Sequence, residues 1–136
     1  MNADERRNRD PLTQSVIGAF YEVSSELGYG FLEAVYRRAL VLALVDRGHE
    51  VCTESSIPVF FRGRPVGDYR ADLLVDGRLM VEVKVGAGLV AAHRAQLLNY
   101  LRATDVEVGL LVNFGPRLTF ERLVFANARK RPPRRA

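Results

Sequence analysis

The sequence predicts a mixed α/β fold, because helix-like and strand-like patterns follow one another along a chain of 136 residues. Two segments with a helical period come first, three strand-like segments follow, and a further helix precedes two last strands. This order, ααβββαββ, is typical of one mixed β-sheet flanked by helices. The predicted helices are residues 12–27, 31–47 and 90–102, and the predicted strands are residues 50–61, 66–75, 78–85, 107–114 and 118–125.

The first helix is recognised by its apolar spacing and by both of its ends. Val16, Phe20 and Val23 recur at intervals of three and four residues, which places them on one helical face. Pro11 suits the first turn of a helix, because its missing N–H has no partner there in any case. The run Gly-Tyr-Gly at residues 28–30 then breaks the helical pattern.

Asp76-Gly77 predicts a tight β-hairpin between the second and third strands. Glycine tolerates the positive φ that two-residue hairpin turns require, and apolar runs flank the pair on both sides. A two-residue turn would pair Val75 with Arg78. That register would set Asp72 opposite Val81, and therefore next to Glu82 on the facing strand.

The composition excludes several classes of protein. No apolar run approaches the roughly 20 residues of a membrane-spanning helix, so no membrane partner is expected. Cys52 is the only cysteine, which excludes an intramolecular disulfide and a cysteine zinc site. The charged N-terminus lacks an apolar signal region, and this predicts a cytoplasmic protein.

We expect a single folded domain, residues 12–126, between two polar ends. Residues 1–11 are predicted to form a flexible arm, and residues 127–136 a disordered basic tail. The tail holds five of the 20 Lys and Arg residues, so the domain itself is nearly neutral. Such a tail either contacts phosphates or only keeps the chain soluble.

Three charged residues interrupt the apolar strands of the hairpin: Asp72, Glu82 and Lys84. Side chains alternate along a strand, so Glu82 and Lys84 share a face, and the hairpin brings Asp72 close to them. Charges are costly to bury unless they are paired or bind a metal, so the cluster is either a salt-bridge network or a cation site. Carboxylate oxygens suit Mg²⁺ or Mn²⁺, and a cation with a lysine beside it is the arrangement that hydrolytic phosphoryl transfer needs.

The helix after this cluster carries a polar face. His93, Gln96 and Tyr100 lie at positions i, i+3 and i+7, which share one side of a helix. The connection 85–89 should return this helix beside the hairpin, where Gln96 and Tyr100 can orient Lys84, a water or a phosphate. The alternative is a solvated helix face with a half-buried tyrosine.

Residues 27–36, Leu-Gly-Tyr-Gly-Phe-Leu-Glu-Ala-Val-Tyr, resemble the signature of the bacterial GxxExxY family, with Gly30, Glu33 and Tyr36 at its named positions. The resemblance covers roughly residues 12–125 and continues through residues 69–75, 81–84, 93–101 and 109–115. This family is placed in the PD-(D/E)XK nuclease superfamily. The resemblance therefore implies a restriction-endonuclease-like core, in which helices flank a mixed sheet.

Carried over by position, the resemblance implies that Asp72 and Glu82 bind the metal and that Lys84 is the catalytic lysine. The carbonyl of Val83 would also face the metal. Glu33 resembles an extra helix acid that some branches of the superfamily add to the metal site, although the helix dipole alone also favours a carboxylate in a first turn.

The same resemblance assigns the polar helix face. Gln96 and Tyr100 look like the glutamine-x-x-x-tyrosine motif of the branch related to exonucleases of recombination. His93 is expected at the rim of the site, and Arg70 and Arg94 are candidates for contacts with a nucleic acid.

The sequence thus predicts a nuclease that uses Mg²⁺ or Mn²⁺ to hydrolyse phosphodiester bonds, with DNA as the favoured substrate and RNA as the other choice. The alternative is a non-catalytic module that uses the nuclease fold to bind a nucleic acid or a protein. The near-neutral domain motivates this alternative, because nucleic-acid enzymes often show a basic stripe. Self-association into a homodimer is compatible with so small a nuclease fold.

Overall fold

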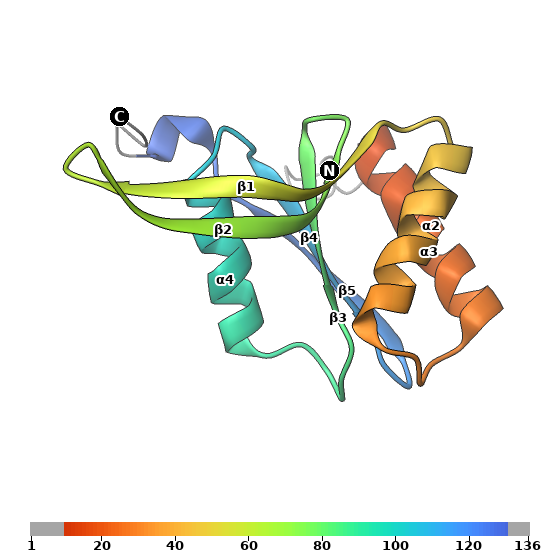
Figure 1. The fold of residues 1–136 in the computed structure, drawn as a ribbon. Coiled ribbons are helices and arrows are strands. Elements are labelled where there is room, and N and C mark those ends of the chain that lie inside the picture. Colours follow the sequence, from red (N-terminus) through yellow and green to blue (C-terminus); the bar gives the residue numbers. More distant parts are fainter. Residues whose placement is uncertain (1–9, 131–136) are drawn as a thin grey trace, which may run out of the picture.

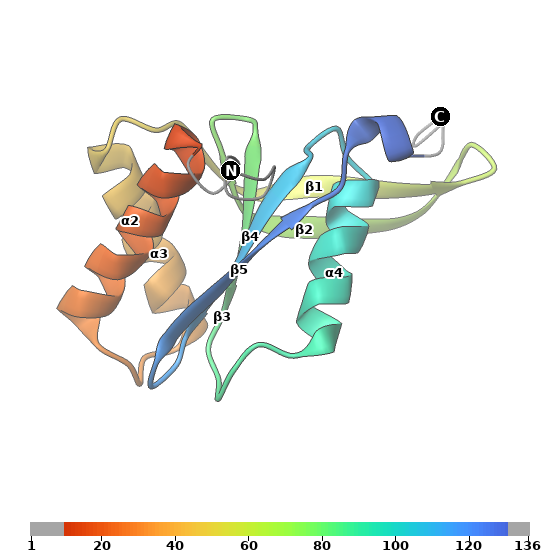
Figure 2. The same cartoon turned by 180° about the vertical axis from the view of Figure 1, so that it is seen from behind.

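Residues 10–130 are described by the computed structural model, and they form a five-stranded sheet between two helical layers (Figure 1). Helices α2 (Pro11–Leu27) and α3 (Glu33–Asp46) cover one face, and α4 (Ala91–Arg102) covers the other. The view from behind shows the same separation of α4 from the α2–α3 pair (Figure 2). The predicted order ααβββαββ is confirmed. No helix of this part of the chain is long and apolar enough to cross a membrane.

The strands lie side by side in sequence order, and only one neighbouring pair is parallel. That pair is β3 and β4, and α4 provides the crossover that a parallel connection requires. All other neighbours are antiparallel. The strands are β1 (Val51–Phe61), β2 (Arg64–Val75), β3 (Leu79–Lys84), β4 (Val108–Phe114) and β5 (Leu118–Val124).

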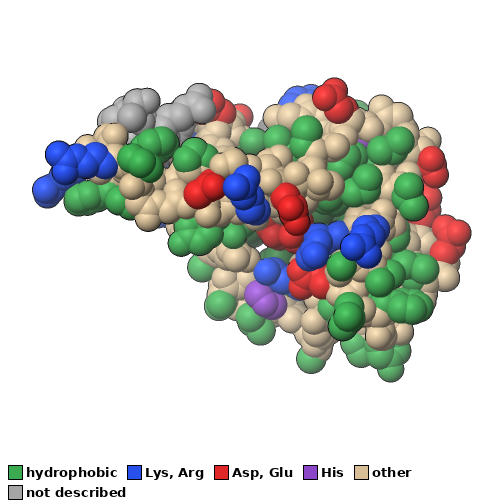
Figure 3. Space-filling view, in the orientation of Figure 1, with side chains coloured by type: hydrophobic (Ala, Val, Ile, Leu, Met, Phe, Trp, Pro, Cys, Tyr) green, Lys and Arg blue, Asp and Glu red, His purple; other side chains and the backbone are tan. Residues whose placement is uncertain are grey.

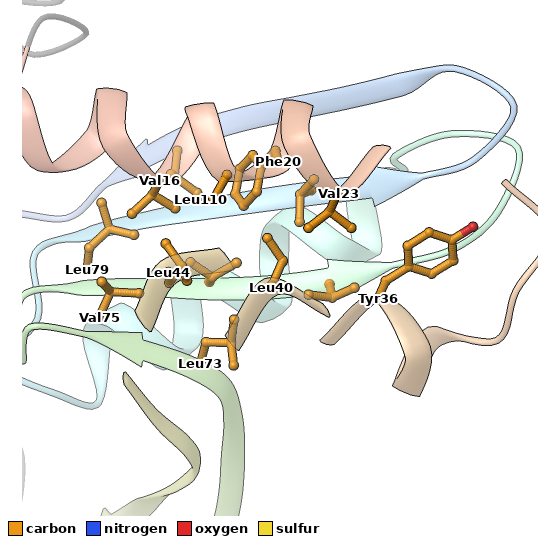
Figure 4. Close-up of a cluster of buried hydrophobic side chains, with 14 of the residues drawn as sticks. Val16, Phe20, Val23, Tyr36, Leu40, Leu44, Leu73, Val75, Leu79 and Leu110 are labelled. Carbon is orange, nitrogen blue, oxygen red and sulfur yellow. The ribbon is translucent and has the colours of Figure 1, made fainter. Parts of the chain in front are cut away.

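The larger apolar core lies between the sheet and the α2–α3 pair (Figure 4). Helix α2 supplies apolar side chains at the spacing that the sequence shows, and α3 and the strands meet them from the other side. Burying such side chains contributes about 1.5–3 kcal/mol each, so this layer carries much of the stability. The labelled members are Val16, Phe20, Val23, Tyr36, Leu40, Leu44, Leu73, Val75, Leu79 and Leu110.

The β1–β2 hairpin extends well beyond the rest of the sheet and passes over α4 (Figure 1). Strand β2 pairs with β3 only over residues 73–75, whereas it pairs with β1 along almost its whole length. A two-stranded hairpin is only marginally stable by itself. Ile57 and Ala71 of the hairpin pack in a second core with Leu97 and Leu101 of α4, which holds the extension in place.

The hairpin register differs from the predicted one by a single residue. Val75 pairs with Leu79 and not with Arg78, so the connection has three residues instead of two. One step beyond the last pair, Asp72 therefore faces Glu82 and not Val81.

The cause of the shift lies outside the hairpin. The side chain of Asp76 accepts hydrogen bonds from the backbone N–H of Glu50 and from His49 Nδ1, each at 2.8 Å, and its φ is +52°. These contacts tie the turn to the chain before β1. A prediction from the turn residues alone does not include these contacts, because both partners come from residues that precede β1.

Both predicted chain ends need correction where the structure describes them. Pro11 is the first residue of α2, as its suitability for a first turn predicts, and the Asp10 side chain caps the helix by accepting a hydrogen bond from Thr13 N at 3.4 Å, so the predicted arm 1–11 reaches two residues too far. Residues 127–130, assigned to a disordered tail, contain the 3-10 helix η1 (Asn127–Arg129) and the buried Lys130. Lys130 is held because its Nζ donates to two backbone carbonyls of the loop before β4. The other residues of the predicted arm and tail, 1–9 and 131–136, lie outside the described residues.

Candidate active site

Two carboxylates meet where β2 and β3 diverge, and each is fixed by the backbone of the opposite strand. The backbone N–H of Asp72 donates to Glu82 Oε1 at 3.2 Å. The N–H of Val83 donates to Asp72 Oδ2 at 2.8 Å. The side chains thus continue the hydrogen bonding of the hairpin beyond its last backbone pair, and they lie close together as a result.

The Glu82 carboxyl group is buried beside a like charge. Only 3% of Glu82 is exposed. Burial, followed by the negative charge of Asp72 and a hydrogen bond to its side chain, raises the pKa of Glu82 to about 8. The group therefore favours either a proton or a nearby cation.

A salt-bridge network does not explain this cluster. Between residues 10 and 130, no ion pair joins Glu82 to any basic group, and none joins Lys84 to either acid. The ion pair that does reach the two acids comes from Arg37, whose Nη1 lies 3.9 Å from Asp72 Oδ1. In the space-filling view, acidic and basic side chains gather in the middle of this face, beside a histidine (Figure 3).

Lys84 is held by the helix on this side of the sheet. Its Nζ donates to Gln96 Oε1 at 3.0 Å, and Gln96 Nε2 donates to the Tyr100 hydroxyl at 3.1 Å. Burial, followed by the charge of Glu82, raises the pKa of Tyr100, so its hydroxyl stays neutral. The spacing of residues 96 and 100 thus places both side chains on the helix face that meets the strand, as the sequence predicts.

Glu33 is not brought into a group with the two strand acids. Its Oε1 accepts a hydrogen bond from Arg37 Nη1 at 2.6 Å, one helical turn along α3. Within the described part of the chain, no three His, Cys, Asp or Glu side chains are grouped so that they could hold a metal. The donors that lie together are the carboxylates of Asp72 and Glu82, and the contribution of the Val83 carbonyl remains a prediction.

Comparison with known proteins places this arrangement in a family. A family model described as the PD-(D/E)XK nuclease superfamily matches residues 10–123, most of the chain. The chain belongs to the PD-(D/E)XK nuclease superfamily. That match does not reach the finer GxxExxY family.

A solved structure shares the fold of this superfamily member. The crystal structure of SSO0001 aligns with a TM-score of 0.54 and 23% sequence identity over 90% of this chain. The chain spans only 62% of the length of that protein. No curated protein gives a significant match.

In this superfamily member, glycine residues and Tyr36 shape the turn between α2 and α3. Gly30 adopts a φ of +115°, a backbone conformation that residues other than glycine rarely adopt. The Tyr36 hydroxyl donates to the Gly28 carbonyl at 2.8 Å, and the Tyr36 ring stacks on Phe114 at 4.8 Å. These contacts hold the chain that leads into α3, and Arg37 of that helix reaches toward the acids.

Three predicted nucleic-acid contacts already have partners within the protein. His93 Nδ1 accepts the backbone N–H of Val90 at 3.2 Å, and burial with the nearby charges of Lys84 and Arg94 lowers the pKa of His93. Arg94 forms two hydrogen bonds with Glu121 on β5, at 2.6 and 2.7 Å, and Arg70 pairs with Asp68 at 3.2 Å. The nucleic-acid contacts of these residues remain predictions.

Asn113 is a neighbour of the site for which the sequence predicts no specific role. It pairs with Lys84 in the parallel ladder and is 1% exposed. Its Nδ2 donates to the Gly86 carbonyl at 3.1 Å, whereas its buried Oδ1 has no hydrogen-bond partner among the described residues. A Cβ on Gly115 would lie 2.2 Å from the same carbonyl. Asn113 and Gly115 thus hold the loop after Lys84, and the sequence signal was the Asn-Phe-Gly run that also predicts an ordinary turn.

Proposed function

We propose that this superfamily member is a divalent-metal-dependent nuclease that hydrolyses phosphodiester bonds in DNA. The observation that carries the proposal is the buried Glu82 beside Asp72, without a basic partner of its own, next to a lysine held by a separate helix. A buried carboxylate in contact with a second carboxylate is unfavourable unless a proton or a cation compensates the charge. DNA is chosen over RNA on the GxxExxY resemblance alone.

The donor set fits a hard divalent ion. Asp72 and Glu82, with the carbonyl of Val83, would hold Mg²⁺ or Mn²⁺, which prefer carboxylate and carbonyl oxygens. Such an ion polarises a phosphate and lowers the pKa of a bound water.

The protein's own side chains would stabilise the charge of the phosphate and keep the reacting groups in place. Lys84 carries a positive charge that can stabilise the negative charge of the phosphate during hydrolysis. Gln96 restricts where the Lys84 ammonium lies, because it also binds the Tyr100 hydroxyl. The backbone bonds of Asp72 and Val83 fix the carboxylates before substrate arrives.

The test is cleavage of DNA by the purified full chain. Linear duplex, circular duplex and single-stranded DNA are incubated with Mn²⁺, with Mg²⁺ or with EDTA. We expect metal-dependent cleavage that falls at least about 100-fold in Lys84→Ala, comparable to the loss of one transition-state donor.

Arg78→Ala, at an exposed turn position, is the matched control for loss of one positive charge. The proposal is wrong if no DNA is cleaved under any condition, or if Lys84→Ala cleaves as well as Arg78→Ala does.

A second candidate is a non-catalytic module that binds DNA. The contact of Arg37 with Asp72 favours it, because the guanidinium supplies part of the charge that a metal would otherwise provide. Binding of DNA in EDTA that survives Asp72→Ala, together with no cleavage, would support this candidate over the nuclease.

A further inference from the structure

A large open cavity lies next to the candidate active site and shares two of its residues. Its volume is about 1070 Å³, and it runs between the β1–β2 hairpin, one face of α4 and the segment around η1. Gln96 and Tyr100 line it, and they are the residues that hold Lys84. The space-filling view shows the outline hollowed beneath the hairpin (Figure 3).

Aromatic side chains of the hairpin face this groove. Tyr69 is 53% exposed, and its ring centroid lies 5.7 Å from that of Tyr100. The register of β1 with β2 shifts between Val59 and Phe60, so both of these neighbours line the cavity. A regular strand would point them to opposite faces, and a bulge is a common means of redirecting one side chain.

The charged residues that line the groove all carry the same sign. Of the described residues around it, three are Lys or Arg and none is Asp or Glu. The Arg102 and Arg129 guanidinium groups lie over the ring of Phe125, at 5.3 and 5.6 Å from its centroid. Neither arginine forms an ion pair within residues 10–130, in contrast to Arg94 and Arg70.

The position of this arginine pair is fixed by the structure. Lys130 is 5% exposed, and its Nζ donates to the carbonyls of Thr104 and Val106 at 2.8 and 2.9 Å. These bonds anchor the segment that carries Arg129 to the loop between α4 and β4. Two free guanidinium groups on one ring form a site suited to phosphate oxygens.

We propose that this groove binds an unpaired strand of DNA and delivers it to the carboxylate site. The inference rests on the proposed nuclease function and specifies its substrate. Exposed aromatic rings stack with unpaired bases, whereas the bases of a duplex stack on each other. Arginines without acidic partners bind the phosphates between those bases, and the shared residues Gln96 and Tyr100 make the groove continuous with Lys84.

The test measures binding without cleavage. Fluorescence anisotropy of the full chain in EDTA compares a labelled single-stranded DNA with a blunt duplex of the same length and sequence, over a range of salt concentrations. We expect tighter binding of the single strand. In the variant carrying both Arg102→Ala and Arg129→Ala, the slope of log K against log salt decreases by about 1.4, because each phosphate contact contributes about 0.7 for single strands.

A matched variant loses the same charge elsewhere. Arg78→Ala with Arg117→Ala removes two exposed arginines that do not line the groove, and it should leave the slope unchanged. Tyr69→Ala should weaken single-strand binding by at least about fivefold, and Tyr69→Phe, which keeps the ring, should not.

Three results would overturn the inference: equal slopes for the two double variants, tight duplex binding with the same dependence on Tyr69, or no effect of Tyr69→Ala. The outcome is independent of the cleavage assay. Groove-dependent binding without any cleavage would contradict the nuclease function alone, and cleavage that is insensitive to the groove variants would contradict this inference alone.

Discussion

At Glu82, the raised pKa gives the metal-free protein a predictable dependence of stability on pH. The ordinary pKa of the carboxyl group is 4.5, and burial beside Asp72 raises it to about 8 in the folded state. Between these values the folded protein binds the extra proton, so its stability decreases as the pH rises through this range. The slope contributed by this one group is at most about 1.4 kcal/mol per pH unit.

Thermal or urea denaturation in EDTA from pH 4.5 to 8 would measure this slope. Glu82→Gln removes the titrating group and should flatten the profile, so that the variant is more stable than the wild type near pH 8. Glu54→Gln, at an exposed position of β1, should leave the profile unchanged. A wild-type stability that increases steadily from pH 4.5 to 8, with Glu82→Gln parallel to it, would contradict the expected burial of this acid.

Gln96 is expected to act through Lys84 as a positioning residue. Gln96→Leu removes the acceptor for the Lys84 ammonium and the donor to Tyr100. A hydrogen bond to a charged group contributes about 1.5–3 kcal/mol, so kcat should fall about 10- to 150-fold.

Gln96→Glu separates this positioning role from a structural one. It keeps an oxygen acceptor for Lys84 and should recover much of the lost kcat, while the melting temperatures of both variants stay near that of the wild type. Equal loss of kcat in the two variants would show that holding Lys84 is not what Gln96 contributes.

Among the elements, the turn between β2 and β3 is connected to α2 through a histidine of the loop that follows α3. Ser15 Oγ on α2 lies 2.7 Å from His49 Nε2, and His49 Nδ1 lies 2.8 Å from Asp76 Oδ2. The N–H of Glu50 donates to the same carboxylate at 2.8 Å. These bonds fix the three-residue connection that brings Asp72 opposite Glu82.

The lowered pKa of Asp76 gives the second pH prediction. The hydrogen bond from Glu50 N–H, and then the one from His49, favour the carboxylate and lower the pKa of Asp76 below its ordinary 3.8. Its contribution to stability is present above pH 3.8 and is lost as the pH falls through the lowered value. Asp76→Asn should therefore be less stable than the wild type at pH 6, and the difference should shrink toward pH 2.5.

Melting temperatures across this range would check the prediction, with Asp46→Asn at the exposed end of α3 as control. A constant difference between Asp76→Asn and the wild type at all pH values would show that the carboxylate charge is not the cause.

The hairpin also shows why element-level patterns placed the acids correctly but missed their register. Alternation along β3 predicts that Glu82 and Lys84 share a face, because that property depends only on the strand itself. The number of residues in the turn depends on Asp76, whose partners His49 and Glu50 lie in the loop between α3 and β1. A pattern of neighbouring residues contains no information on those partners.

At the scale of the whole molecule, the fold was predictable and the groove was not. Each helix and strand carries its own periodic signal, and their order restricts the sheet to few arrangements. The groove depends instead on a bulge after Val59, on packing of the hairpin over α4, and on the anchoring of Lys130. These are contacts between segments that are distant in the sequence. Lys130 in particular lies in a stretch whose composition predicts a disordered basic tail.

The uneven support of the sheet predicts uneven protection of its backbone amides. Strand β3 lies between two strands and contributes side chains to both cores, whereas residues 55–71 of the hairpin have only each other as strand partners. Local opening requires less free energy where fewer buried contacts are broken. Native-state hydrogen exchange should therefore be slowest in β3 and β4 and clearly faster in the outer hairpin.

Because that hairpin forms one wall of the groove, single-stranded DNA should slow exchange there more than in the β5 edge strand. Equal protection across all five strands would show that the extension is as firmly held as the central sheet.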